Sequence, residues 1–190
     1  MSAPETTVPD RVTRSATAMA ERLAASAEPG GQAMVVDVPS QQLYLFESGE
    51  LVGSFPVSTA ERGTGNQEGS LQTPLGLHRV DEKIGADAPR GMIFRARQPT
   101  GELAEILEGP EERAARDDVT TRILWLEGLE PGVNQGGDVD SKQRYIYIHG
   151  TPEEGRIGRP ASHGCVRMTN ADVITLFDRV QEGALVDIIE

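Results

Sequence analysis

The stretch IGRPASHGCVRM, residues 157–168, contains the only cysteine of the chain, Cys165, with His163 two positions before it. A second histidine, His149, lies sixteen residues before the cysteine. A thiol attacks as its thiolate, so a reactive cysteine needs a neighbour that accepts its proton, and imidazole does this near neutral pH. The pattern therefore predicts a thiol nucleophile, Cys165, with His149 as its base.

Gly164 lies directly before the cysteine and has no side chain that would block its backbone. Backbone N–H groups of such a loop can approach the oxyanion that forms on an attacked carbonyl. We therefore predict that the backbones of His163, Gly164 and Cys165 supply an oxyanion site. A helix expected to begin near Asn170 would lower the pKa of the thiol through its dipole.

Short apolar runs on both sides of this stretch predict strands, separated by turn residues. The predicted strands cover residues 33–38, 42–46, 51–57, 75–84, 92–97, 121–126, 144–149 and 184–189. Helical spacing predicts an amphipathic helix over residues 10–27, with Asp10 as its N-cap and residues 28–31 as its end, and a second helix from Asn170 to Val180. Because strands outnumber helices, we expect a mainly β fold with flanking helices, either a sandwich or barrel-like.

Two polar segments lack the hydrophobic period of either a helix or a strand. Residues 58–73 are rich in glycine but lack the glycine spacing and Lys-Ser/Thr pair of phosphate loops, so they are predicted to form a mobile surface loop. Residues 101–107 are predicted to form a helical turn, and the acidic residues up to 118 a solvated loop.

Composition limits the classes of function that this chain can have. The 190 residues fit a single domain, and 30 Asp and Glu against 18 Lys and Arg give a net charge of −12. This charge disfavours nucleic acid and anionic lipid as partners. One cysteine cannot form a disulfide within the chain. Neither an export signal nor an apolar stretch that could span a membrane is evident, so we expect a cytoplasmic protein, or a periplasmic one if an export signal has been removed.

The tetrapeptide IHGT at 148–151, the stretch at 157–168 and the tripeptide NAD at 170–172 together resemble the L,D-transpeptidase catalytic domain of the YkuD type. The likeness extends over roughly residues 33–190. It predicts an N-terminal extension with a short helix (residues 1–30) and a catalytic domain (residues 31–190), in which residues 81–141 form a lid or cleft wall.

The resemblance implies a thiol acyl enzyme that needs no cofactor or metal. Its partner is a peptidoglycan stem peptide or muropeptide, cleaved between the third residue, a diamino acid, and D-alanine. Cys165 matches the nucleophile, His149 the base, and the backbone carbonyl of Gly150 the group that orients the base. Arg167 stands where many members carry Asn, and we expect it to bind a substrate carboxylate together with His163.

The acceptor of the acyl group is left open by the motif. Water gives an L,D-carboxypeptidase of muropeptide recycling, whereas an amine gives an L,D-transpeptidase that forms cross-links or exchanges D-amino acids in the periplasm. The lack of an evident export signal favours water. Two other classes are alternatives: a zinc site made by Cys165, His163 and His149, which no paired-cysteine or HExxH motif supports, and a wall-binding module without turnover.

The remaining candidates are expected to have structural roles. His78 lies within a predicted strand, and Ser162 is expected to hydrogen bond within its loop. Tyr145 and Tyr147 alternate along a predicted strand, where they either pack in the core or line a groove.

Overall fold

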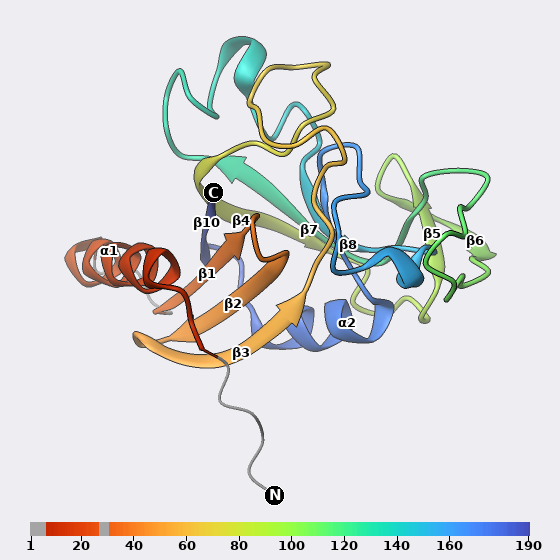
Figure 1. Ribbon diagram of the computed structural model, residues 1–190, viewed down its shortest axis with the longest axis horizontal. Helices are drawn as coiled ribbons and strands as arrows, with labels where there is room; N and C mark the ends of the chain where they lie inside the picture. Colours follow the sequence, from red (N-terminus) through yellow and green to blue (C-terminus); the bar gives the residue numbers. More distant parts are fainter. Residues whose placement is uncertain (1–6, 27–30) are drawn as a thin grey trace, which may run out of the picture.

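The computed structural model describes residues 7–26 and 31–190, and in this part of the chain a ten-stranded sheet is flanked by two α-helices. The elements in chain order are α1 (Asp10–Ser26), β1 (Gln32–Asp37), β2 (Gln42–Glu47), β3 (Glu50–Pro56), β4 (Gly76–Ile84), β5 (Met92–Arg95), β6 (Gln98–Leu103), β7 (Val119–Gly128), β8 (Tyr147–Gly150), β9 (Val166–Met168), α2 (Asn170–Arg179) and β10 (Leu185–Ile189). Single 3₁₀ turns, η1 (Gly137–Val139) and η2 (Glu154–Arg156), precede and follow β8. Figure 1 shows α1 at one end of the sheet and the β5–β6 hairpin at the other.

The sheet closes on itself. Its strands follow the order β3-β2-β1-β10-β4-β7-β5-β6, and β8 joins the other edge of β7 and pairs in turn with β9. Ser58, just after β3, exchanges two backbone hydrogen bonds of 2.9 Å with Arg167 of β9. This last pairing connects β9 to the end of β3, so that β3-β2-β1-β10-β4-β7-β8-β9 form a closed circuit. The expected mainly β, barrel-like fold with flanking helices is thus confirmed.

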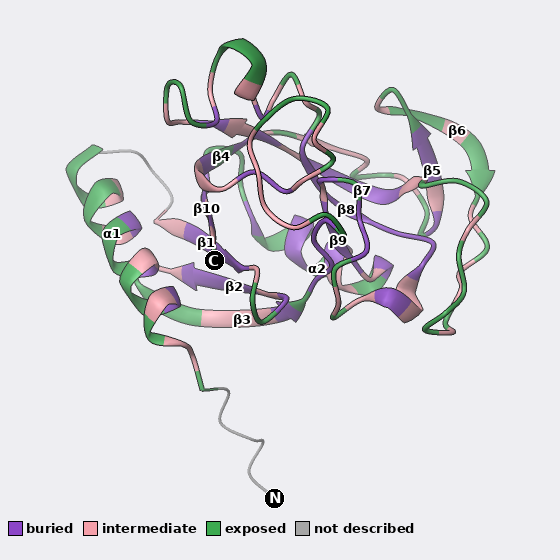
Figure 2. Ribbon diagram, turned by 45° about the horizontal axis from the view of Figure 1, so that its top comes forward, coloured by how far each residue is buried: buried purple, intermediate pink, exposed green. Residues whose placement is uncertain are grey.

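Strand β1 shows why some strands appear in the sequence as continuous apolar runs. β1 is buried along nearly its whole length because both its faces are covered. Met34 and Val36 face the main core, while Ala33 and Val35 pack beneath α1. Figure 2 shows that buried residues concentrate in the central strands, whereas the outer face of α1 and strand β6 are exposed.

The two helices cover different parts of the sheet. Val12, Ala16 and Met19 recur at helical spacing and form the buried face of α1. Arg11 ties this helix to β1, since its guanidinium donates two hydrogen bonds, of 2.5 and 2.8 Å, to the buried carboxylate of Asp37. Helix α2 lies beneath β7 and β8 and adds Leu176 to the main core.

Several local predictions are wrong. Residues 98–103 form edge strand β6 rather than part of a helical turn, because they pair with β5 across a two-residue turn. Strand β9 and the parallel pairs β1–β10 and β8–β9 were not predicted. Helix α2 is capped by Thr169, whose Oγ1 accepts the N–H of Asp172 at 3.1 Å, and Asp10 is the first residue of α1 rather than its cap.

Residues 58–73 are not a free surface loop. Ser58, Thr59, Ala60 and Thr73 are all buried, and the segment packs against the loop that contains Cys165. The predicted end of the first helix at 28–31 falls largely outside the described residues. No helix within 7–26 or 31–190 is long and apolar enough to cross a membrane.

Candidate active site

His149 and Cys165 are brought together by the parallel pair β8–β9. His149 lies opposite Arg167 in the register, and Cys165 directly precedes β9. The buried ring of His149 makes a 2.6 Å hydrogen bond between Nδ1 and the carbonyl of Gly150. A carbonyl can only accept, so Nδ1 carries the proton and Nε2 is the basic nitrogen.

Gly150 has no room for a side chain. A Cβ atom here would lie 2.6 Å from Oδ1 of Asn170 and 2.7 Å from the carbonyl of Thr120. Asn170 is fully buried, accepts a hydrogen bond from Thr120 Oγ1 at 2.6 Å and donates one to the carbonyl of Thr151 at 2.9 Å. Asn170 therefore holds the backbone that orients His149, a role that sequence reasoning missed because it depends on contacts with residues far away in the chain.

The thiol and the imidazole are both uncharged in the resting site. Burial raises the pKa of the Cys165 thiol to about 11, although the N–H of Tyr147, Arg167 and Arg144 act in the opposite direction. Burial likewise lowers the pKa of His149 to about 4. Burial dominates the shift, and the expected lowering contribution of the following helix stays a prediction. At neutral pH both the thiol and the imidazole are therefore neutral.

The sulfur is held by main-chain groups of β8 and the residues just before it. Sγ of Cys165 accepts the N–H of Tyr147 at 3.3 Å and donates to the carbonyl of Tyr145 at 3.4 Å. Next to it, a hollow of about 190 Å³ is lined by Glu68, Gly69, Leu71, Gln143, Arg144, Tyr145, Ile146 and His163. Main-chain groups of the two tyrosines therefore frame the thiol. Tyr145 lies in the turn before β8, not in the strand predicted over residues 144–149.

The loop before Cys165 has a fixed shape. Ser162 Oγ donates to the carbonyl of Cys165 at 2.6 Å and accepts the N–H of Gly164 at 3.2 Å, while Gly164 adopts a positive φ of 133°. Thr73 Oγ1 donates to the carbonyl of Gly164 at 2.9 Å. Since the N–H of Gly164 is directed to Ser162, the N–H groups of His163 and Cys165 are the remaining donors of the predicted oxyanion site.

Arg167 and His163 contact the same carboxylate. Arg167 is buried and donates one hydrogen bond to Glu153 Oε2 at 3.0 Å and another to Asp117. His163 Nδ1 lies 2.5 Å from the second oxygen of Asp117. Burial opposes ionisation of Asp117, but Arg167, His149 and His163 together lower its pKa. Sequence reasoning did not single out Asp117, and substrate binding by Arg167 and His163 remains a prediction.

Asp117 ends an acidic loop, residues 104–118, that is tied along the segment leading to Cys165. Leu107 N–H donates to the carbonyl of Pro152 at 2.8 Å, and Ala114 N–H donates to Glu153 at 2.9 Å. Arg159 adds an ion pair with Glu111 at 3.1 Å. Within residues 81–141, this loop is one part that borders the site, and much of the remainder belongs to the sheet.

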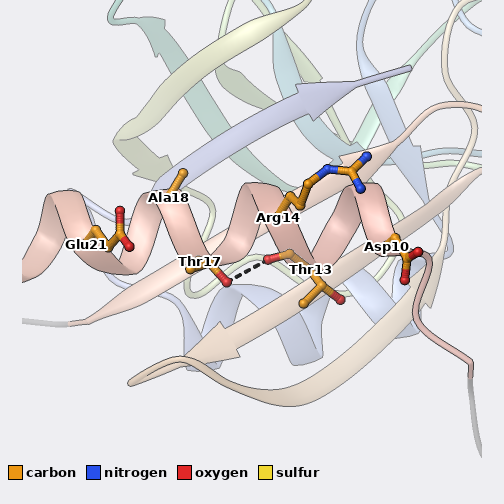
Figure 3. A pocket seen from close by; sticks show the side chains of 6 residues that line it. All are labelled: Asp10, Thr13, Arg14, Thr17, Ala18 and Glu21. Carbon is orange, nitrogen blue, oxygen red and sulfur yellow. Dashed lines mark hydrogen bonds between the residues drawn. The ribbon is translucent and has the colours of Figure 1, made fainter.

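The other candidates lie elsewhere. His78 of β4 is fully buried, with its ring nitrogens 2.8 Å from Gly76 O and Ser141 Oγ, and burial lowers its pKa to about 4. In the part of the chain that the structure describes, no three His, Cys, Asp or Glu side chains are arranged to hold a metal ion. A hollow of about 400 Å³ on α1 is lined only by residues of that helix (Figure 3).

A cysteine directly before one strand, with an oriented imidazole on the neighbouring strand, supplies the groups that enzymes use for acyl transfer through cysteine. The sequence profile of the L,D-transpeptidase catalytic domain, YkuD, matches residues 31–188, and the chain belongs to this family. No curated protein sequence matched the chain.

Solved structures share the fold. L,D-transpeptidase 3 from Mycobacterium tuberculosis, in complex with a faropenem-derived adduct, is 16% identical with a TM-score of 0.51, over 85% of this chain and 61% of that chain. A variant of the Enterococcus faecium L,D-transpeptidase is 13% identical with a TM-score of 0.50, over 84% of this chain and 50% of that one. The chain thus spans only half to three fifths of these relatives.

Proposed function

We propose that this protein is a cysteine L,D-carboxypeptidase that removes D-alanine from peptidoglycan tetrapeptide stems. The bond cleaved joins the third residue, a diamino acid, to the terminal D-alanine. The observation that carries the proposal is the 2.6 Å hydrogen bond from His149 Nδ1 to the Gly150 carbonyl, next to a strand that begins just after Cys165. It leaves Nε2 of His149 as a base for the thiol.

The reaction begins from the neutral pair. As substrate binds, the thiol proton leaves the carbonyl of Tyr145 and passes to Nε2 of His149, while sulfur attacks the peptide carbonyl. Backbone N–H groups of His163 and Cys165 stabilise the oxyanion. His149 then gives its proton to the leaving amine of D-alanine, and a thioester remains on Cys165. Water, deprotonated by His149, attacks the thioester and releases the shortened peptide and the free thiol.

The acidic loop supports water as the acceptor. Asp117 joins the loop to His163 and Arg167 on one side of Cys165, so a second stem peptide that approaches from this side must displace it. A water molecule can reach the thioester without displacement of the loop. We propose a cytoplasmic role in muropeptide recycling, with the periplasmic L,D-transpeptidase as the alternative, and fractionation of the native protein distinguishes the two locations.

Incubation with a purified disaccharide-tetrapeptide tests the proposed reaction. We expect tripeptide and free D-alanine, identified by mass spectrometry, with no new product when a second D-amino acid is added. Exchanged or dimeric products would show that an amine is the acceptor. Activity abolished by a chelator and restored by zinc would support the zinc site instead, and no turnover of any stem would support a wall-binding module.

The buried hydroxyl of Thr73 offers a test of the oxyanion loop. Thr73→Val keeps the shape but removes the hydrogen bonds to Gly164 O and from Ala60 N–H, each 2.9 Å long. We expect kcat to fall roughly 10- to 100-fold through misplacement of the loop. Loss of two buried hydrogen bonds should also lower the free energy of unfolding by about 1–3 kcal/mol. Kinetics and thermal unfolding measure the two effects.

Thr64→Val is the matched control, because its hydroxyl bonds to Glu190 near the surface, at 2.6 Å. Its kcat and stability should stay near those of the wild type, within about 0.5 kcal/mol for stability. If Thr73→Val were less stable yet turned over at the normal rate, Thr73 would have no part in shaping the loop for catalysis.

A further inference from the structure

The turn between β5 and β6 adopts an unfavourable backbone conformation. It consists of Ala96 and Arg97, which connect Arg95 and Gln98 of the paired strands. Both turn residues have positive φ angles, 47° and 66°, although neither is glycine or asparagine. Such a conformation persists only where the surroundings hold it, and it is often found at functional sites.

The contacts of the Arg97 side chain hold the turn. Its guanidinium carbon lies 4.6 Å from the ring centroid of Trp125 and 5.1 Å from that of Tyr145. One terminal nitrogen donates a hydrogen bond of 3.3 Å to the hydroxyl of Tyr147. The charge is thus fixed at an aromatic wall formed by these three residues: the faces of Trp125 and Tyr145 attract the cation, and Tyr147 binds it through its hydroxyl.

The same tyrosines frame the thiol. The carbonyl of Tyr145 and the N–H of Tyr147 hold Sγ of Cys165, at 3.4 and 3.3 Å. The ring of Tyr147 packs in the same small cluster as Cys165, and its hydroxyl accepts the hydrogen bond from Arg97. A peptide bound at Cys165 can therefore reach Arg97 along the aromatic wall.

Other cations near the thiol are already engaged by the protein. Arg167 binds the carboxylates of Asp117 and Glu153. The guanidinium of Arg144 contacts four protein acceptors, namely Gly65 O, Asn66 O, Ser70 Oγ and Gln72 O. Arg97, by contrast, has no carboxylate within 4.0 Å among the described residues, and its one hydrogen-bond partner is a neutral phenol.

We propose that Arg97 is a specificity-determining residue that binds a carboxylate of the stem peptide. This inference rests on the proposed function, because it assumes a stem peptide at Cys165. A guanidinium matches a carboxylate through two parallel hydrogen bonds. In a chain of net charge −12, a fixed cation beside the site also offsets repulsion of an anionic substrate. The carboxylate comes either from the terminal D-alanine or from the side chain of a dicarboxylic third residue.

Kinetics of Arg97→Met test this role, with release of D-alanine as the readout. We expect KM for the tetrapeptide to rise about 10- to 100-fold, as for loss of a hydrogen-bonded charge pair, with kcat nearly unchanged. Arg97→Lys should recover part of the loss. Arg95→Met is the matched control, since Arg95 lies on the same hairpin and pairs with Glu102 at 3.3 Å. Its KM should stay at the wild-type value.

Two altered substrates identify the carboxylate. One carries a carboxamide at the terminal D-alanine, and the other has lysine as its third residue. The substrate that lacks the carboxylate bound by Arg97 should have a high KM with the wild type, and Arg97→Met should raise it no further. An equal effect of Arg97→Met on all three substrates, or an unchanged KM, would overturn the assignment.

Failure of the proposed function can be recognised separately. D-Alanine release measures acylation whether water or an amine resolves the thioester, so a transpeptidase would still report on Arg97. If no D-alanine is released, calorimetry with the Cys165→Ala protein measures binding of the tetrapeptide directly. If Arg97→Met weakens this binding at least tenfold, the Arg97 site is supported even without turnover. If Arg97→Met leaves the binding unchanged, the Arg97 site alone is overturned. If the tetrapeptide does not bind at all, both proposals are overturned.

Discussion

Cys165→Ala is expected to reduce the rate of D-alanine release by about 10⁴-fold or more, since removal of a nucleophile that works with a base leaves only the residual effects of the site. Cys165→Ser should lose nearly as much. The serine hydroxyl is similar in size, but its proton is held far more tightly than that of the thiol, and His149, whose pKa burial lowers to about 4, is a weak base for it. Single-turnover assays with the disaccharide-tetrapeptide measure both variants.

The fold should survive both substitutions. Cys165 is only partly buried at the edge of a small cluster that includes Tyr147 and Trp125. Loss of its sulfur removes few contacts of the main core, so the melting temperature should change by no more than about 4 °C, which corresponds to about 1 kcal/mol in a chain of this size. Gross unfolding of the serine variant would indicate a structural thiol, and turnover near the wild-type rate would exclude Cys165 as nucleophile.

Intact-protein mass spectrometry supplies an independent readout. Under rapid quenching, the wild type should show an added mass equal to the acyl part of the stem, and Cys165→Ala should show none. A covalent adduct on the alanine variant would place the acyl group on another residue. Such a result would contradict the thioester mechanism even if D-alanine were still released.

The parts of the site that could be predicted from sequence lie close together along the chain or at the ends of clear strands. Cys165 and Gly164 occupy one short loop, and His149 ends a strand of alternating apolar residues. The parallel pairing of β8 and β9 places His149 on the strand next to the one that follows this loop. Strand β1 could also be predicted, because a strand buried on both faces appears in the sequence as a continuous apolar run without alternating polar residues.

The parts that were missed depend on contacts between distant residues. Asp117 reaches His163 from 46 positions away, and nothing in its acidic surroundings distinguishes it from neighbouring carboxylates. Thr73 and Asn170 are ordinary polar residues in the sequence, and they matter only because folding buries them against Gly164 and Gly150. Local composition cannot encode such contacts.

Strand errors have similar causes. β9 spans three residues, which is too short for a period of two to be recognised. The β5–β6 hairpin lacks the Asn-Gly or Asp-Gly pair that normally marks a two-residue turn. Its turn residues, Ala96 and Arg97, are held by packing against aromatic rings of other strands. The position that sequence rules fail to predict is therefore the one where the chain presents a cation to the site.

His149→Gln is expected to lower kcat/KM for the tetrapeptide by about 10²- to 10⁴-fold, the range typical of a lost general base. The wild type should also have an unusual pH profile. Because burial lowers the pKa of His149 to about 4, its imidazole stays neutral and able to accept a proton well below the usual pKa of 6.5. We expect kcat/KM to fall only as the pH approaches 4, rather than near 6.5.

As the pH is lowered, the free energy of unfolding should begin to fall at a higher pH than kcat/KM does. In the unfolded chain His149 and His78 take up protons as the pH falls through 6.5, whereas both folded rings resist protonation down to about 4. The unfolded state then binds more protons, so the free energy of unfolding decreases as the pH falls from about 6.5 to 4. Urea titrations across this range measure the slope, and His149→Gln should reduce it without removing the part due to His78.

The exposed His163 provides the matched control for the base. If His149 is the base, His163→Gln should leave the acid limb of kcat/KM near pH 4, whatever it does to substrate binding. In His149→Gln, the remaining kcat/KM should no longer fall near pH 4, because no group with a pKa of about 4 then has to be deprotonated for attack. An acid limb in the wild type that disappears in His163→Gln would instead assign the base to His163 and would leave His149 as a buried structural ring.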